Sequence, residues 1–170
     1  MSLRKMILPG LMICLLGFAG CLVSKFTLAP LEQAKVDRAY VGNWDTSNTP
    51  GNDHADLIIR NIDDKMYYVE LREKDKPDAE RYVGFIADVK GVTFAHLRPM
   101  QADGDIPDEW VIQRIAIKDG KLSIRGLSED FFKAKKIESA QQLRQVIEEN
   151  LDNDAMYDKD SVTATRIAAK

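Results

Sequence analysis

The stretch Tyr67-Tyr68-Val69-Glu70-Leu71-Arg72 sets Tyr67, Val69 and Leu71 in alternation with three more polar side chains. Successive side chains of a β-strand point to opposite faces of its sheet. This period of two therefore places the three apolar residues on one buried face and leaves the other face solvated. We predict a strand over residues 66–73, in a sheet that is apolar on one side.

Similar short runs lie on both sides of this stretch and are separated by polar turns. Asp119-Gly120, between two apolar runs, is the strongest hairpin signal in the chain, and 63–65 and 90–91 predict two further tight turns. The predicted strands cover 40–45, 55–62, 66–73, 81–89, 92–98, 109–118 and 121–127. Seven strands at this spacing indicate an antiparallel meander, closed into a barrel or folded as a sandwich.

The pattern changes after Leu127. Ser128 can cap a short helical stretch, and Ser139 begins a capping box that opens an amphipathic helix over 139–151. Its apolar stripe consists of Leu143, Val146, Ile147 and Leu151, which favours packing of the helix on the barrel. Residues 161–167 are predicted to form a last strand that pairs with the first one and so protects two sheet edges.

The N-terminus has the pattern of a secretory signal. Arg4 and Lys5 precede the apolar run 6–18, which is followed by Ala19-Gly20-Cys21. This ending resembles the lipobox of bacterial lipoproteins, which implies cleavage before Cys21, a lipid on its sulfur and acylation of the new N-terminus. An ordinary cleaved signal and an uncleaved membrane anchor are the alternatives.

The lipoprotein resemblance also implies an organisation and a location. Residues 1–20 would be the cleaved signal, 21–37 the lipidated cysteine and a tether, and 38–170 a single barrel-like domain. Attachment through three acyl chains such as palmitate would be effectively permanent. Leu22, rather than aspartate, follows the cysteine, which in the enterobacterial sorting pattern favours the outer membrane, facing the periplasm.

Composition limits the partners of the chain. It carries 24 basic and 27 acidic residues, and loss of Arg4 and Lys5 with the signal leaves a net charge near −5. Such a balance does not favour binding to nucleic acid or to an anionic membrane surface. Cys14 would leave with the signal and Cys21 would carry the lipid, so the fold is expected to stand without disulfides.

The first predicted strand contains Gly42-Asn43-Trp44. A Gly-x-Trp element that opens a meander of about eight strands, with one late helix, resembles the lipocalins and the wider calycin barrels. The resemblance implies a mainly β, antiparallel barrel in which Trp44 closes one end and the open end holds an apolar ligand. It also implies a basic side chain stacked on the Trp44 ring, for which Arg125 and Arg166 are the candidates.

Metal binding and catalysis have little support in the sequence. Asp53, His54 and Asp56 lie in a polar turn, and the chain has two histidines in all, too few for an ordinary zinc site. The acidic loops 103–109 and 152–160 do not have EF-hand spacing. No serine stands in a Gly-x-Ser-x-Gly context and no phosphate-binding glycine loop is present, so we expect neither a cofactor nor enzyme activity.

Two main functional hypotheses and a weaker third one remain open. In the first, the barrel of a lipid-anchored envelope protein binds a small apolar or amphipathic ligand. The candidate contacts are Trp44, Tyr67, Val69, Leu71, Phe85 and Phe94, which serve equally well as a packed core.

In the second, the protein is an interaction module, an assembly accessory or inhibitor, that binds an envelope protein partner. It would use an exposed sheet face or the 99–109 loop with Pro99, Met100 and Trp110. An interior void above roughly 300 Å³ would separate the two hypotheses. A weaker third hypothesis is a hydrolase that uses Asp53 or Asp105.

Overall fold

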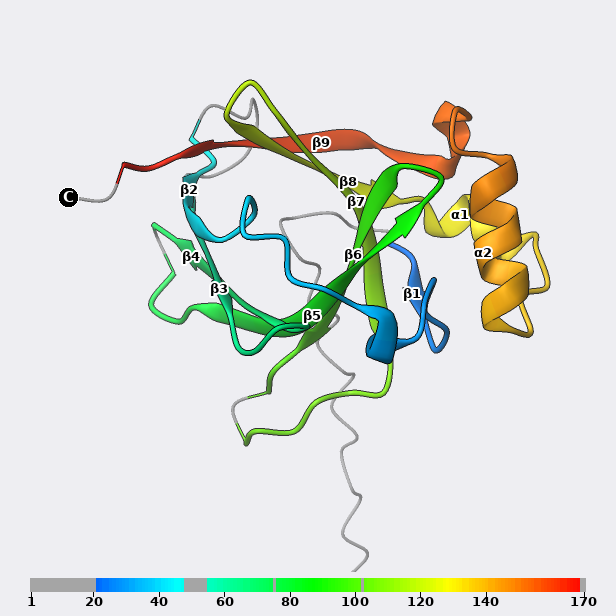
Figure 1. Cartoon of the computed structure of the whole chain (residues 1–170), viewed down its shortest axis with the longest axis horizontal. Coiled ribbons are helices and arrows are strands. Elements are labelled where there is room, and N and C mark those ends of the chain that lie inside the picture. Colours follow the sequence, from blue (N-terminus) through cyan, green and yellow to red (C-terminus); the bar gives the residue numbers. More distant parts are fainter. Residues whose placement is uncertain (1–20, 48–54, 75, 102, 169–170) are drawn as a thin grey trace, which may run out of the picture.

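The structure, a computed structural model, describes residues 21–47, 55–74, 76–101 and 103–168. The chain is mainly β and forms a closed antiparallel barrel of eight strands (Figure 1). The strands of the barrel are β2 (Gly42–Asp45), β3 (Ala55–Asn61), β4 (Tyr67–Glu73), β5 (Glu80–Val89), β6 (Val92–Pro99), β7 (Trp110–Lys118), β8 (Lys121–Leu127) and β9 (Tyr157–Arg166). All seven predicted strands are present, and most of their bounds agree to within one or two residues.

The barrel closes because its last strand returns to its first. Each strand pairs with the next in the chain, and β9 pairs with β2 through Trp44 opposite Arg166 and Asp45 opposite Thr165. The predicted pairing of the terminal strand with the first strand is confirmed. Closure leaves no open edge among these eight strands that could pair with another chain.

Tight turns gather at one end of the barrel. Lys118 pairs with Lys121, so Asp119 and Gly120 form a two-residue hairpin turn. Asp119 has φ 51° and Gly120 φ 74°, and Lys90 and Gly91 have φ 51° and 81°. Positive φ at both central residues matches the twist of the flanking strands, which explains the preference for Asp-Gly there. The predicted Asp119-Gly120 hairpin is confirmed.

Residues 36–41 cover this same end. The Val36 N–H donates to the Asp64 carbonyl oxygen of the β3–β4 turn at 2.9 Å, and the Asp37 N–H donates to the Tyr67 hydroxyl at 2.6 Å. In Figure 1 the segment crosses in front of the barrel strands. We call this the plugged end. We call the opposite end, where the 103–109 loop lies and β8 leads into α1, the loop end.

Two short helices and a 3-10 turn connect β8 to β9. They are α1 (Glu129–Lys133), α2 (Ala140–Glu149) and η3 (Asp154–Met156). The Ser128 hydroxyl caps α1, and the Ser139 hydroxyl accepts from the Gln142 N–H at 3.2 Å at the start of α2. β9 begins at Tyr157, earlier than the predicted residue 161. None of the described helices has the length and apolar character to span a membrane.

The strands separate two cores. The interior cluster fills the barrel, and its largest fully buried members include Trp44, Tyr82 and Leu122. The second cluster joins β5, β6 and β7 to α1, α2, η3 and the N-terminal segment, with Phe85, Phe94 and Ile147 among its members. The barrel is therefore apolar on both faces of β5 and β6, since the helices and the N-terminal segment cover the outer face there.

The N-terminal segment is packed rather than loose. Leu22, Leu28 and Ala34 are buried in the second cluster, β1 (Val23–Ser24) pairs with β7, and η2 (Leu31–Gln33) follows. This differs from the tether predicted over 21–37. Burial of these apolar side chains and the hydrogen bonds of the segment to β7, Leu127 and His96 together oppose the loss of backbone entropy.

Candidate functional site in the barrel interior

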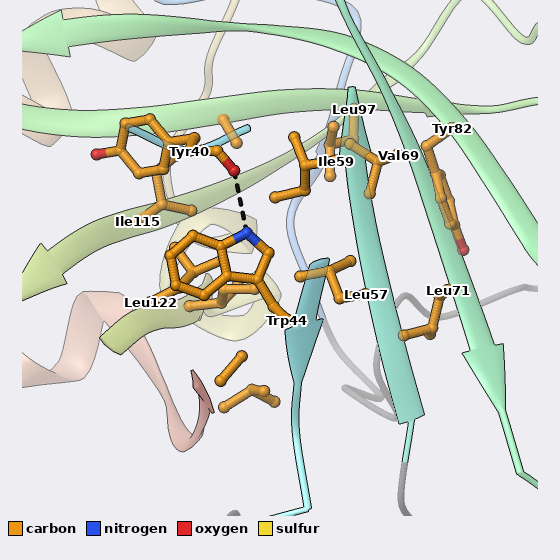
Figure 2. Packing of buried hydrophobic residues seen from close by; sticks show 14 of the residues in the cluster. Tyr40, Trp44, Leu57, Ile59, Val69, Leu71, Tyr82, Leu97, Ile115 and Leu122 are labelled. Carbon is orange, nitrogen blue, oxygen red and sulfur yellow. Dashed lines mark hydrogen bonds between the residues drawn. The ribbon is translucent and has the colours of Figure 1, made fainter. Parts of the chain in front are cut away.

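Trp44 lies in the barrel near its plugged end. Its side chain is fully buried, and the indole N–H donates to the Tyr40 carbonyl oxygen at 3.0 Å (Figure 2). Tyr40, Leu122 and Ile115 are neighbours of the ring in the same view. The hydrogen bond satisfies the one polar atom of the indole, so the ring can be buried without a desolvation penalty for that atom.

A basic side chain covers the Trp44 ring. The guanidinium carbon of Arg166 lies 4.3 Å from the ring centroid, and the same group donates to the Val41 carbonyl oxygen at 2.8 Å and to that of Ala39. Of the two predicted candidates, Arg166 occupies this place, and Arg125 instead lies over the Tyr157 ring. Arg166 thus joins β9 to the segment that covers the plugged end.

The Tyr67 hydroxyl fixes the same segment from inside. It accepts from the Asp37 N–H at 2.6 Å and donates to the Asp37 carbonyl oxygen at 3.1 Å. Burial of the side chain is the main cause that raises the pKa of Tyr67 to about 12. The phenol is therefore neutral across the physiological range and acts as a structural hydrogen-bonding group.

The interior contains one small apolar cavity among the described residues, with a volume of about 50 Å³. Its walls are formed by residues of β3 to β8 together with Tyr40, among them Leu57, Ile59, Leu97 and Ile115. Pockets for small ligands measure roughly 300–1,000 Å³. A cavity of this size holds a few waters and no lipid-sized ligand unless the barrel expands.

Gln113 contributes the amide side chain of the cavity wall. Its side chain is 1% exposed, and its amide nitrogen has no hydrogen-bond partner among the described residues. A buried donor without a partner costs about 1–3 kcal/mol. The sequence contains the signal for this residue, since Gln113 shares the inward period of β7 with Val111 and Ile115, but our sequence analysis did not single it out.

Replacement of Gln113 by leucine is expected to stabilise the ligand-free protein by about 1–3 kcal/mol, because the unpaired amide is removed and apolar volume is kept. Urea unfolding of the two proteins measures the difference. The matched control is Gln145→Leu on the exposed face of α2, which should change stability by less than about 0.5 kcal/mol. A destabilised Gln113→Leu protein would show that the amide has a partner in solution.

The predicted ligand contacts separate into two groups. Trp44, Tyr67, Val69 and Leu71 belong to the interior cluster. Phe85 and Phe94 belong instead to the second cluster, although Phe85 also borders the cavity. The faces of β5 and β6 that carry these two residues pack under the helices and the N-terminal segment. Phe94 is therefore not part of the cavity wall, whereas Phe85 reaches it, and a role of either residue in ligand binding stays a prediction.

His96 lies in the second core. Its ring is fully buried, stacks on Phe85 with centroids 4.7 Å apart and meets the edge of Trp110. Its Nε2 accepts from the Leu28 N–H at 3.1 Å, which ties the N-terminal segment to the barrel. Nδ1 has no partner at the distance and angle of a hydrogen bond among the described residues, although the nearby Phe85 backbone opposes the lowering of the His96 pKa by burial. His96 is more deeply buried than the partly buried structural histidine that we predicted.

The 99–109 loop is less available than predicted. Trp110 is 7% exposed and packs in the second cluster, with the Arg98 guanidinium 3.8 Å from its ring centroid. Arg98 also pairs with Asp108 at 2.9 Å. Pro99 and Met100 are half-buried, so this loop offers Ile106, at 40% exposure, as its large exposed apolar side chain.

The described part of the chain contains no cluster of side chains suited to bind a metal ion. No three His, Cys, Asp or Glu side chains there gather closely enough to hold a metal ion. Asp53 and His54 lie outside the described residues, and Asp56 and Asp105 are exposed. In the 152–160 loop, Asp154 pairs with Arg125 at 3.1 Å and Asp158 contacts Cys21.

Cys21 lies at the barrel wall where β8 ends. It is 7% exposed and belongs to the interior cluster, and its sulfur lies 3.6 Å from Asp158 Oδ2. Burial is the main cause that raises the pKa of Asp158, and the contact with Cys21 opposes this rise. A Cβ atom at Gly126 would lie 2.9 Å from the sulfur and 2.2 Å from the Asp158 carboxylate, so any larger residue there would force these two side chains to move.

Comparison with known proteins gives no relative. No protein-family model, curated protein or solved structure matches the chain. The function must therefore be argued from the geometry above.

Proposed function

We propose that the chain is a lipid-anchored protein of the cell envelope, facing the periplasm, whose packed barrel acts through its surface on a protein partner. The observation that carries the second half of this proposal is the interior cavity of about 50 Å³, far below the roughly 300 Å³ of the smallest ordinary ligand pockets. A barrel filled by its own side chains is a rigid support for an interaction surface.

The lipocalin-like features support a calycin-type fold but do not by themselves support ligand binding. Trp44, capped by Arg166 at the plugged end, has the arrangement that the Gly-x-Trp resemblance implies. Those residues hold the segment 36–41 over the barrel and do not enlarge its interior. A calycin-type barrel that has lost its cavity is therefore consistent with both observations.

The outer face of β4 and β5 is the best candidate for the interaction surface. Glu70 is 6% exposed and accepts from the Tyr68 hydroxyl at 2.5 Å, while Arg72 and Arg81 flank it with more than half of each side chain exposed. The hydrogen bond from Tyr68 is the largest of the causes that lower the Glu70 pKa. A groove of about 420 Å³ adjoins these residues. The groove is lined by three basic and three acidic side chains, so it offers a polar partner ion pairs of both signs and carries no excess charge.

The lipid anchor has a direct test. Replacement of Cys21 by serine should abolish incorporation of a clickable fatty acid into the protein, because serine cannot form the thioether. The measurement is in-gel fluorescence after labelling of whole cells, with Cys14→Ser as the matched control that should label like the unaltered protein. Undiminished labelling of Cys21→Ser would exclude the proposed anchor.

Ligand binding remains the second candidate, and one observation favours it. The unpaired amide nitrogen of Gln113 lies on the cavity wall, where an acceptor oxygen of a small ligand would satisfy it. Native mass spectrometry of the secreted chain from residue 22 onward separates the candidates. A lipid-sized adduct that disappears in Gln113→Leu would support the carrier, and a clean monomer mass supports the packed module.

A further inference from the structure

No flexible linker separates the proposed lipid on Cys21 from the barrel. The Leu22 N–H donates to the Leu127 carbonyl oxygen at 2.8 Å, and the two residues that follow form β1 against β7. The first backbone hydrogen bond to the barrel thus comes one residue after the lipidated cysteine. A barrel attached in this way cannot drift from the membrane as one on a flexible linker can.

The position of the sulfur sets the direction of the anchor. Cys21 faces the barrel interior beside Gly126 and Asp158, and residues 36–41 cover the plugged end. A diacylglyceryl group does not fit an interior whose cavity is about 50 Å³. It must therefore leave toward the loop end, and it must be attached before this corner of the barrel folds around the sulfur.

We propose that the loop end of the barrel rests directly on the bilayer and that the plugged end points away from it; this rests on the proposed lipid anchor at Cys21. Among the described residues, Val23, 49% exposed, and Ile106, 40% exposed, are the large apolar side chains exposed at the loop end. Ile62 is 55% exposed in the β3–β4 turn at the plugged end. It lies about 20 Å farther along the barrel axis, given strands of about eight residues with the usual tilt.

The anchor, rather than surface charge, must hold this orientation. Asp103, Asp105, Asp108 and Glu109 make the loop beside Ile106 acidic, which an anionic bilayer would repel. A zwitterionic bilayer is therefore the suitable surface for a test. The 99–109 loop would then face lipid headgroups, and a protein partner would meet the plugged end or the outer strand faces.

The experiment compares a fluorophore at the two ends of the full lipidated protein. Ile106→Cys and Ile62→Cys are each labelled with the same thiol-reactive dye, since the thioether at Cys21 does not react and Cys14 leaves with the signal. The proteins are reconstituted in phosphatidylcholine vesicles that contain nitroxide-headgroup phosphatidylcholine. We expect quenching at residue 106 to exceed that at residue 62 several-fold. Insertion of twelve Gly/Ser residues after Cys21, about 20 Å of flexible reach, should remove the difference.

The outcomes distinguish the two levels of the proposal. Mass spectrometry that finds no diacylglyceryl group on Cys21 would overturn the anchor, and the orientation with it. A lipidated protein with equal quenching at both ends, or with stronger quenching at residue 62, would overturn the orientation alone and leave the anchor intact.

Discussion

Trp44→Ala is expected to destabilise the protein by about 3–5 kcal/mol, the range for loss of a large buried aromatic side chain. The indole is fully buried, and its removal also leaves the Tyr40 carbonyl oxygen without its donor. The Arg166 guanidinium would lose the ring that it covers at 4.3 Å. Urea unfolding followed by circular dichroism measures the change in the free energy of unfolding, which for a small domain is only about 5–15 kcal/mol in all.

Two variants separate the causes of this loss. Trp44→Phe keeps most of the apolar volume and removes the indole N–H, so it should cost about 1–3 kcal/mol. Arg166→Met keeps a long apolar chain and removes the cation, and a double-mutant cycle with Trp44→Phe should give a coupling of about 0.5–2 kcal/mol. A Trp44→Ala protein that loses less than about 1 kcal/mol would mean that the plugged end is not part of the cooperative core.

The strands could be predicted because their signals are local. Alternation at Tyr67, Val69 and Leu71 depends only on the geometry of a strand with one buried face. The Asp119-Gly120 turn depends only on the ease with which these residues adopt positive φ. Barrel closure followed from the count of strands and from the final strand, though a sandwich would have given the same pattern.

The inward faces of β5 and β6 could not be predicted. Phe85 and Ala87 alternate with Gly84 and Ile86, so both faces of β5 are apolar and the period alone does not say which one is interior. The choice is made by α2 and the N-terminal segment, which cover the face that carries Phe85. This coverage depends on tertiary packing between distant segments, which the periodicity of a single strand does not predict.

The packing of the N-terminal segment and the size of the cavity could not be predicted from the sequence for the same reason. β1 has two residues, too few for any periodic signal, and its strand exists because β7 offers it hydrogen bonds. Gln113 could be placed on the inward face of β7 from the alternation of that strand. The volume of the cavity beside it, however, depends on how twelve other side chains fill the barrel. The candidate ligand residues were thus identified as apolar and buried, while the absence of room for a ligand required coordinates.

Acidification should destabilise the protein through His96 well before most carboxylates titrate. Burial is the main cause that lowers the pKa of His96 from 6.5 to about 3. In the unfolded chain the His96 imidazole therefore binds a proton below about pH 6.5, whereas in the folded protein it is protonated only below about pH 3. The contribution of His96 to stability is complete above the unfolded pKa and is lost as the pH falls between these values, at about 1.4 kcal/mol per unit.

The measurement is the free energy of unfolding at pH 7, 6, 5 and 4 for the unaltered protein and for His96→Gln. Glutamine retains an acceptor for the Leu28 N–H and cannot take up the proton, so its curve should be flatter by about 2–3 kcal/mol between pH 6 and pH 4. Carboxylates titrate in both proteins and cancel in the difference, and His54→Gln reports what the other histidine contributes. Parallel curves for the unaltered protein and His96→Gln would contradict the prediction, because they would mean that the His96 ring can take up a proton in the folded state. The N-terminal segment would then have to open to admit it, since His96 is the side chain that holds Leu28 against the barrel.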